Sequence, residues 1–292
     1  MYLDHFSLSE FPFGITPDTR FTFESKAQRE VIETLLVALK MGEGFVKVTG
    51  EVGTGKTHAC RRLLNTLQDD PAYRVVFLPN PAVTGRTLLL SLCLDLGLEV
   101  SPRAPRDELN ATLTKSLLKH ASWDVSVVAL LDESQAMPDE ALEAVRLLSN
   151  LETERSKLLR VVLFGQPELD QKLAQTNLRQ LNQRITFQHS LDRLTPEETA
   201  RYLDHRLRVA GYSGPDLFPA LPSRAIHRAS RGTPRLINVI AHKCLLLAAG
   251  ERATRIDLLH VEAAAKDTPA CHRLDFWERF RLRLPQRLAQ AA

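Results

Sequence analysis

The chain has 292 residues, of which 44% are hydrophobic and 25% are charged. These values are ordinary for a soluble protein, and the length allows about two domains of roughly 100–200 residues each. The formal net charge is +3, and residues 268–292 carry all of this excess, with five arginines against Asp275 and Glu278. The remaining body is balanced, which argues against a protein that binds nucleic acid through a basic body.

Cysteine usage and the apolar runs bear on the compartment. The four cysteines are far apart and form no C-x-x-C pair, so neither a zinc site nor a disulfide framework is indicated. Asp4 and Glu10 interrupt the start where a signal peptide needs a continuous apolar run, and Lys243 interrupts the apolar stretch at residues 236–249. The sequence therefore predicts a cytoplasmic protein with no transmembrane span.

Apolar runs alternate with helical patterns through the first two-thirds of the chain. Five near-continuous apolar runs predict strands of a parallel sheet that is covered on both faces, at residues 45–49, 75–78, 127–131, 161–164 and 185–191. Helices are expected at residues 30–41, 57–67, 84–96, 107–119, 139–151 and 167–174. This order predicts a doubly wound α/β layer over residues 1–192.

Beyond residue 191 the strand signals stop and helices begin with explicit start signals. Thr195-Pro196-Glu197-Glu198 resembles a capping box with Pro at the first helical position. Thr233-Pro234 begins another helix, residues 254–265 form a last short one, and residues 213–222 form a loop. An all-α domain is therefore expected at residues 193–267, followed by a basic amphipathic tail at residues 268–292.

A phosphate-binding motif follows the first predicted strand. Residues 50–57, Gly-Glu-Val-Gly-Thr-Gly-Lys-Thr, match G-x-x-x-x-G-K-[ST] between a strand and a helix. The loop N–H groups can surround a phosphate, the Lys56 ammonium can reach the β and γ oxygens, and the Thr57 hydroxyl can bind Mg²⁺. The motif predicts an ATP site formed by Gly50, Glu51, Val52, Gly53, Thr54, Gly55, Lys56, Thr57 and His58.

Two further strands end in polar residues. The strand at residues 127–131 is followed by Asp132 and Glu133, at the edge where open α/β sheets bind ligands. In a nucleoside triphosphatase the first acid holds Mg²⁺ and the second activates the attacking water, and the phosphate loop favours these roles over a solvated turn. Gln166, after the next strand, either hydrogen-bonds the γ-phosphate or the lytic water or simply ends its strand.

Several segments in order resemble the AAA+ ATPases over residues 6–266. More narrowly, the chain is similar to the ExeA/GspA-type ATPases of general secretion and pilus systems, including the MshM-like ATPases of MSHA pilus biogenesis. The segments that carry this resemblance are Phe11-Pro12-Phe13, Thr16-Pro17-Asp18, Phe21, Gly42-Glu43-Gly44-Phe45, residues 49–57, Leu131-Asp132-Glu133, Phe164-Gly165-Gln166-Pro167-Glu168-Leu169, Leu181-Asn182-Gln183-Arg184-Ile185 and Gly232-Thr233-Pro234-Arg235.

The resemblance implies roles for four more residues. Arg184, or else Arg179 nearby, matches the arginine finger that reaches the γ-phosphate of a neighbouring subunit, although a surface arginine is the alternative. Arg235 matches the sensor-2 arginine of the helical lid, or it forms a helix-end salt bridge. Pro17 matches the segment that lies against the adenine, which core packing of its aromatic neighbours explains nearly as well.

The implied protein is an Mg-ATP-dependent AAA+ ATPase that acts as a homo-oligomeric ring or filament. Residues 1–192 would bind the nucleotide and residues 193–267 would form the lid. Larger ExeA-like members continue into a membrane span, so this chain is expected to dock through its tail or lid on a separate inner-membrane partner. It would then be cytoplasmic and peripheral to the inner membrane.

Two other functions remain. The AAA+ core is shared by DNA-directed regulators of transposition of the TnsC/TniB type, which bind DNA in an ATP-dependent manner, and by nucleotide-gated scaffolds with negligible turnover. The balanced body charge argues mildly against the first and Glu133 against the second. The aromatic residues and interleaved arginines of residues 273–284 suit a membrane surface, a partner groove, nucleic-acid phosphates or packing on the chain's own lid.

Overall fold

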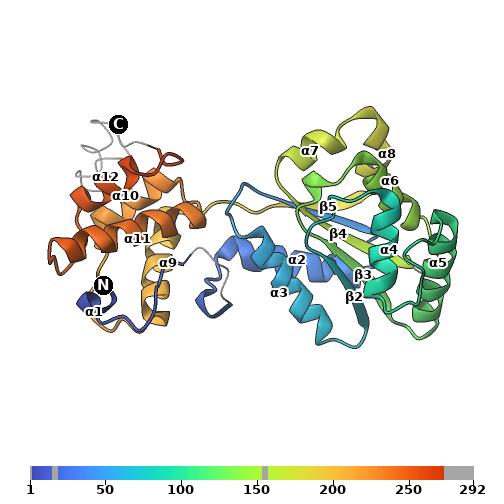
Figure 1. The fold of residues 1–292 in the computed structure, drawn as a ribbon, viewed down its shortest axis with the longest axis horizontal. Coiled ribbons are helices and arrows are strands. Elements are labelled where there is room, and N and C mark those ends of the chain that lie inside the picture. Colours follow the sequence, from blue (N-terminus) through green and yellow to red (C-terminus); the bar gives the residue numbers. More distant parts are fainter. Residues whose placement is uncertain (1, 15–18, 153–156, 273–292) are drawn as a thin grey trace. The chain divides into compact units, whose positions relative to one another are not determined.

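The computed structural model describes residues 2–14, 19–152 and 157–272. They form two compact units, each with its own core (Figure 1). One is an α/β unit at Lys26–Leu191, and the other is a helical unit made of the described parts of Met1–Ser25 and Asp192–Ala292. In these described ranges, no helix combines the length and the apolar character needed to cross a membrane.

The α/β unit contains a five-stranded parallel sheet in the order β2-β3-β4-β1-β5. Its strands are β1 (Phe45–Thr49), β2 (Tyr73–Leu78), β3 (Ser126–Leu131), β4 (Leu159–Gly165) and β5 (Ile185–Ser190). Each predicted strand is present, with ends shifted by at most two residues. Because the strands are parallel, the segments that follow β1, β3 and β4 emerge at the same edge of the sheet. These three strands are neighbours in the order β3-β4-β1.

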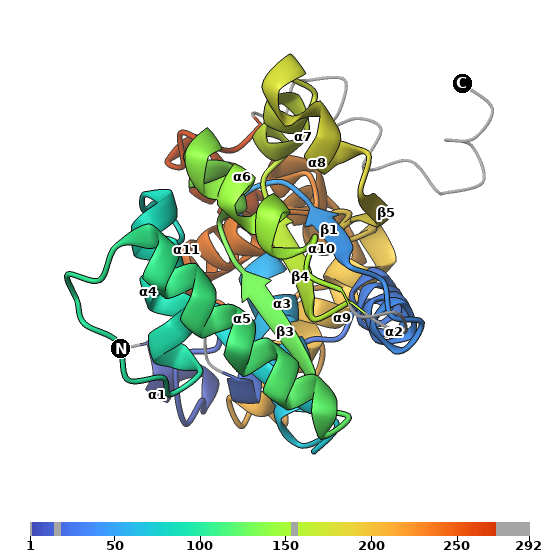
Figure 2. The same ribbon diagram turned by 90° about the vertical axis from the view of Figure 1, so that its right-hand side faces the viewer.

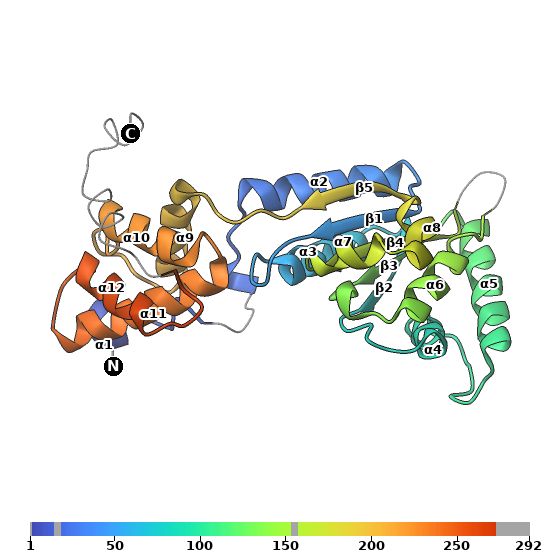
Figure 3. The same ribbon diagram turned by 90° about the horizontal axis from the view of Figure 1, so that it is seen from above.

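Helices cover both faces of this sheet (Figures 2 and 3). Alternate strand residues face opposite sides, so Val46 and Val48 pack with helices α2 and α3, whereas Phe45 packs with the other layer. The first layer contains α2 (Lys26–Lys40) and α3 (Lys56–Gln68). The second contains α4 (Gly85–Asp95), α5 (Arg106–Ser122), α6 (Asp139–Leu148), α7 (Glu168–Leu173) and α8 (Arg179–Asn182), together with the 3₁₀ turns η2 (Ser134–Ala136) and η3 (Thr176–Leu178).

The helical unit is built from α9 (Pro196–Val209), α10 (Ala220–Ser230), α11 (Pro234–Gly250) and α12 (Leu258–Lys266), with the short α1 (Tyr2–Phe6) and the 3₁₀ turn η1 (Thr19–Phe21). The predicted capping box at Thr195 and Glu198 is present. Two predicted boundaries differ. The expected loop at residues 213–222 ends early because α10 begins at Ala220, and α12 begins at Leu258 and not at residue 254, because Asp257 caps it.

The N-terminal segment packs with the helical unit, whereas the sequence placed all of residues 1–192 in the α/β domain. Tyr2, Phe6, Phe13 and Phe21 are each at most 5% exposed and lie in the same core cluster as the helices α9 to α12. The motif resemblance could not show this, because it gave the identity of the aromatic residues and not the surface that buries them. The described residues 2–14 and 19–25 therefore belong structurally with residues 192–272.

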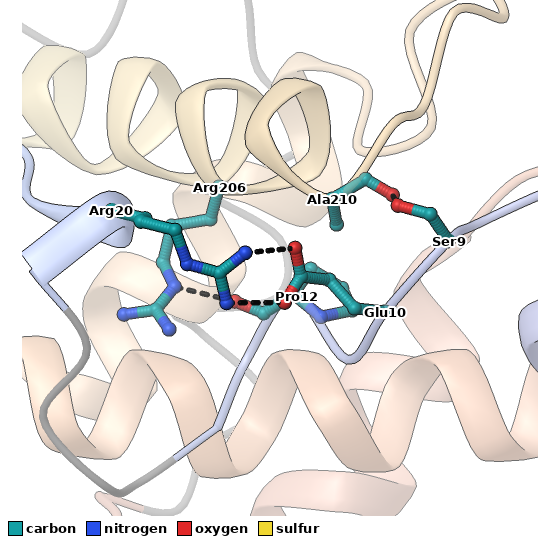
Figure 4. Close-up of polar contacts among 6 residues, drawn as sticks. All are labelled: Ser9, Glu10, Pro12, Arg20, Arg206 and Ala210. Carbon is teal, nitrogen blue, oxygen red and sulfur yellow. Dashed lines mark hydrogen bonds and ion pairs between the residues drawn. The ribbon is translucent and has the colours of Figure 1, made fainter.

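Polar contacts fix this segment on α9 (Figure 4). The Arg206 guanidinium, which is 8% exposed, donates through Nε to the carbonyl oxygen of Pro12. Ser9 donates its hydroxyl to the carbonyl oxygen of Ala210 at 2.8 Å. The Arg206 contact is made to a main-chain carbonyl of the segment, whereas the Ser9 contact depends on the hydroxyl of that residue.

Candidate nucleotide site

The phosphate loop joins β1 to α3 at the carboxyl edge of the sheet, in the predicted context. Gly55 has φ of 101°, and a Cβ there would lie 2.6 Å from Nε2 of Gln28. A Cβ on Gly50 would lie 2.8 Å from the carbonyl oxygen of Leu191. Gly55 is therefore required by its backbone conformation, and Gly50 by its close packing against the Leu191 carbonyl. Thr54 closes the turn by donating its hydroxyl to the carbonyl oxygen of Glu51 at 2.9 Å.

Lys56 points into this loop. Lys56 is 5% exposed, and its Nζ donates to the carbonyl oxygens of Gly50 at 2.7 Å and Glu51 at 2.9 Å. Burial lowers the pKa of Lys56, and the nearby carboxylates of Glu133 and Asp132 oppose that shift. The ammonium therefore lies within the field of both acids at the end of β3.

Asp132 and Thr57 lie together. Asp132 is 2% exposed, and its burial raises the pKa of the carboxyl group, whereas a hydrogen bond with the Thr57 side chain lowers it. The Glu133 N–H also donates to Oδ1 of Asp132 at 2.9 Å. A hydroxyl and a carboxylate are hard oxygen donors that fit Mg²⁺, which commonly takes few protein ligands and completes its shell with water and phosphate. The described part of the chain contains no cluster of three or more His, Cys, Asp or Glu side chains suited to a metal.

Glu133 is held by two side-chain amides. Its backbone has φ of 52°, in the left-handed region. Its Oε2 accepts a hydrogen bond from Nε2 of Gln166 at 3.2 Å and another from Nε2 of Gln135 at 2.6 Å. The structure thus brings Gln166 to the second acid. Gln135 was not singled out in the sequence, where its place two residues after Glu133 gave the only signal.

Arg184 lies at the other end of the sheet. Ile185 pairs with Phe45 in the β5–β1 register, so Arg184 precedes the strand at its amino end. The phosphate loop begins after Thr49, roughly 16 Å further along the strand direction at ~3.3 Å per residue. Nη1 of Arg184 lies 3.5 Å from Oγ of Ser149. The structure therefore does not bring Arg184 to the phosphate loop of its own chain, and the exposed Arg179 begins α8.

The remaining predicted residues are distributed over both units. His58 is half-buried in the first turn of α3, next to Thr57. Glu51 and Val52 are exposed on the loop, and Gly53 adopts φ of 81°. Arg235 is exposed at the second residue of α11 in the helical unit, and Pro17 lies outside the described residues.

Comparison with known proteins agrees with this geometry. A family model described as an AAA domain matches residues 39–173. General secretion pathway protein A of Aeromonas hydrophila is 38% identical over 278 residues, which is 95% of this chain and 50% of that protein. The chain contains an AAA domain, and over nearly its whole length it is similar to General secretion pathway protein A. It spans about half the length of this curated relative.

Solved structures share the fold of this AAA protein. They include the ORC2 protein of Aeropyrum pernix (TM-score 0.63, 16% identity, 88% of this chain and 73% of that one). Cdc6p of Pyrobaculum aerophilum gives a TM-score of 0.64 at 18% identity, over 86% and 71% of the two chains. The RuvB branch migration motor of Thermotoga maritima gives 0.56 at 16% identity, over 88% and 73%. The predicted P-loop AAA+ fold is confirmed.

Proposed function

We propose that this AAA protein hydrolyses ATP with Mg²⁺. The observation that supports this most strongly is the convergence of Lys56, Thr57, Asp132, Glu133 and Gln166 at the carboxyl edge of one sheet. The residue types match the needs of phosphoryl transfer, in which the protein positions the phosphates and stabilises the charge of the transition state.

Each residue has a chemical task in this proposal. The loop N–H groups and Lys56 bind the β- and γ-phosphates, and Thr57 and Asp132 hold Mg²⁺. The metal, when bound, neutralises charge on the phosphate oxygens. Glu133 accepts a proton from the attacking water. Gln166, held at 3.2 Å from the Glu133 carboxylate, orients that water or the γ-phosphate.

A neighbouring subunit would complete the site. Arg184 immediately precedes β5 at the amino end of the sheet, so its proposed contact with a γ-phosphate is one made to another chain. Such a planar cation stabilises transition-state charge and makes turnover depend on assembly. The rate of hydrolysis per subunit would accordingly rise with protein concentration. Arg235 of the helical unit is proposed to link the bound nucleotide to the lid.

The cellular role is inferred from the relationship to General secretion pathway protein A. We propose that hydrolysis drives assembly or conformational switching of a bacterial envelope machine for type II secretion or for type IV or MSHA pilus biogenesis. A separate inner-membrane protein would dock on the helical unit or on residues 273–292. The protein would then act at the cytoplasmic side of that membrane.

Phosphate release by the purified protein tests the reaction. Wild-type protein should release phosphate from ATP in Mg²⁺ and not in EDTA, and Lys56→Ala protein should release none. The proposed reaction would be wrong if the wild-type protein released no phosphate at either low or high protein concentration. A Lys40→Ala variant, altered at an exposed residue at the end of α2, is the matched control.

Affinity capture from bacterial membranes tests the role. Full-length protein and protein lacking residues 273–292 are compared, both with ATP. Retention of one integral inner-membrane protein by the full-length chain supports the envelope role. Absence of such a protein, together with ATP-stimulated and salt-sensitive binding to duplex DNA, would instead support the DNA-directed alternative.

A further inference from the structure

Gln135 joins the ends of two neighbouring strands. Its Nε2 lies 2.6 Å from Oε2 of Glu133, which follows β3, and its Oε1 lies 3.0 Å from the backbone N of Gln166, which follows β4. The orientation of the amide is fixed by chemistry, because the carboxylate can only accept and the N–H can only donate. Gln135 therefore uses both ends of its side chain at once.

The surroundings keep Gln135 in this position. A Cβ on Gly165 would lie 2.7 Å from Cδ2 of Leu169 and 3.3 Å from Oε1 of Gln135, so the glycine leaves room for both side chains. Nζ of Lys172 on α7 lies 3.5 Å from the carbonyl oxygen of Gln135 and donates to that of Met137. Ser134 donates its hydroxyl to the carbonyl oxygen of Leu131 at 2.8 Å. These hydrogen bonds restrain the turn that carries Gln135 from both sides.

The hydrogen bonds from Gln135 and Gln166 restrict the orientation of the Glu133 carboxylate. Both amide donors bind the same oxygen, Oε2, and within the described residues Oε1 accepts no hydrogen bond. A carboxylate on a flexible side chain would otherwise sample several rotamers. With Oε2 held, the rotation of the group is restricted and Oε1 is left for a water molecule.

We propose that Gln135 is a positioning residue for ATP hydrolysis, which orients the Glu133 carboxylate by donating to Oε2 while the Gln166 N–H fixes its own amide. The inference rests on the proposed ATPase function. It assigns Gln135 no contact with the nucleotide, so its loss should lower kcat and leave KM and nucleotide affinity nearly unchanged.

Two substitutions separate positioning from a structural role. Gln135→Glu retains an oxygen that can accept from the Gln166 N–H and loses the donor to Glu133. Gln135→Met loses both contacts. If the residue only satisfies the Gln166 N–H, then Gln135→Glu should keep wild-type turnover. If it positions Glu133, both variants should lose roughly tenfold or more in kcat, since small displacements of a reacting group cost about this much.

A double-mutant cycle with the uncharged Gln135→Met tests whether the loss of turnover comes from the positioning of Glu133. The charge that Gln135→Glu adds cannot explain its result. In a Glu133→Gln background, Gln135→Met should change the residual rate by less than about twofold, because the group that it positions is already disabled. The same proportional loss in both backgrounds would overturn the proposal. The exposed Gln68 at the end of α3 supplies the matched control, Gln68→Met.

The assays are kcat and KM from phosphate release, the Kd of a non-hydrolysable ATP analogue and the thermal midpoint. Wild-type kcat in a folded Gln135→Met or Gln135→Glu variant would overturn the Gln135 proposal and leave the ATPase function standing. An inactive wild-type protein would overturn the ATPase function and this inference with it. If Gln135→Met does not fold, Gln135→Glu and its cycle with Glu133→Gln decide the matter.

Discussion

Lys56 donates a 2.7 Å hydrogen bond to the carbonyl oxygen of Gly50, six residues earlier in the same loop. The ammonium is thereby held inside the curve of the loop, where a phosphate would bind. Lys56→Ala removes this charge, and the affinity for an ATP analogue should fall at least about 100-fold, equivalent to about 2.7 kcal/mol. Titration calorimetry measures this loss. An affinity within about threefold of wild type would contradict the assignment of Lys56 to the phosphates.

Replacement of Glu133 separates binding from turnover. Glu133→Gln keeps the size of the side chain and removes the base, so the affinity for ATP should be retained while phosphate release falls by about 10²–10⁴-fold. Single-turnover phosphate release and analogue binding are measured on the same preparation. Unchanged turnover would show that another group takes the proton from water.

Arg184 should act across a subunit boundary. Arg184→Ala should bind ATP and turn it over slowly, and Lys56→Ala should not bind it. A mixture of the two variants should be more active than either alone, because Lys56→Ala subunits still offer Arg184 to the intact phosphate loops of Arg184→Ala subunits. Arg179→Ala is mixed with Lys56→Ala in parallel, and whichever arginine variant is slow alone and rescued in the mixture identifies the finger.

Arg206 should stabilise the helical unit. Its buried guanidinium bonds the Pro12 and Gly14 carbonyls and the Tyr202 hydroxyl, and it lies 4.8 Å from the Phe21 ring centroid. Arg206→Ala should lower the free energy of unfolding by about 2–4 kcal/mol, because buried acceptors lose their donor.

Urea unfolding measures the effect of Arg206→Ala. The control is Arg208→Ala in the same helix. Arg208 forms an exposed 3.2 Å pair with Asp204, whose loss should cost under about 1 kcal/mol. Equal losses in the two variants would show that Arg206 does not hold the N-terminal segment.

Two histidines should make the helical unit sensitive to acid. Burial lowers the pKa of His227, with Glu197 opposing the shift and Arg228 adding to it, and burial lowers the pKa of His242. The folded state therefore holds fewer protons than the unfolded chain, so stability is present above the ordinary value of about 6.5 and is lost as the pH falls below it.

Thermal unfolding at pH 7.5 and pH 5.5 measures this dependence. The midpoint should be lower at pH 5.5, and the double variant His227→Gln, His242→Gln should show a smaller difference. Asp132 acts in the opposite direction, since burial raises the pKa of its carboxyl group. An identical pH dependence in the double variant and the wild-type protein would exclude the two histidines as its source.

The sequence alone determined the strands, most helices and the core of the site. This was possible because apolar runs, the capping box at Thr195 and the G-x-x-x-x-G-K-[ST] loop are encoded in neighbouring residues. The strand order was not needed to expect Lys56 near Asp132, since the carboxyl ends of parallel strands meet at one edge.

Only the tertiary structure decided which distant segments meet. It placed residues 2–14 and 19–25 in the helical unit, set Arg184 at the amino end of the sheet, and brought Gln135 between Glu133 and Gln166. These outcomes depend on strand register and on which surface buries an aromatic side chain. Both are fixed by packing between residues that are far apart in the sequence, and a local sequence pattern does not specify that packing.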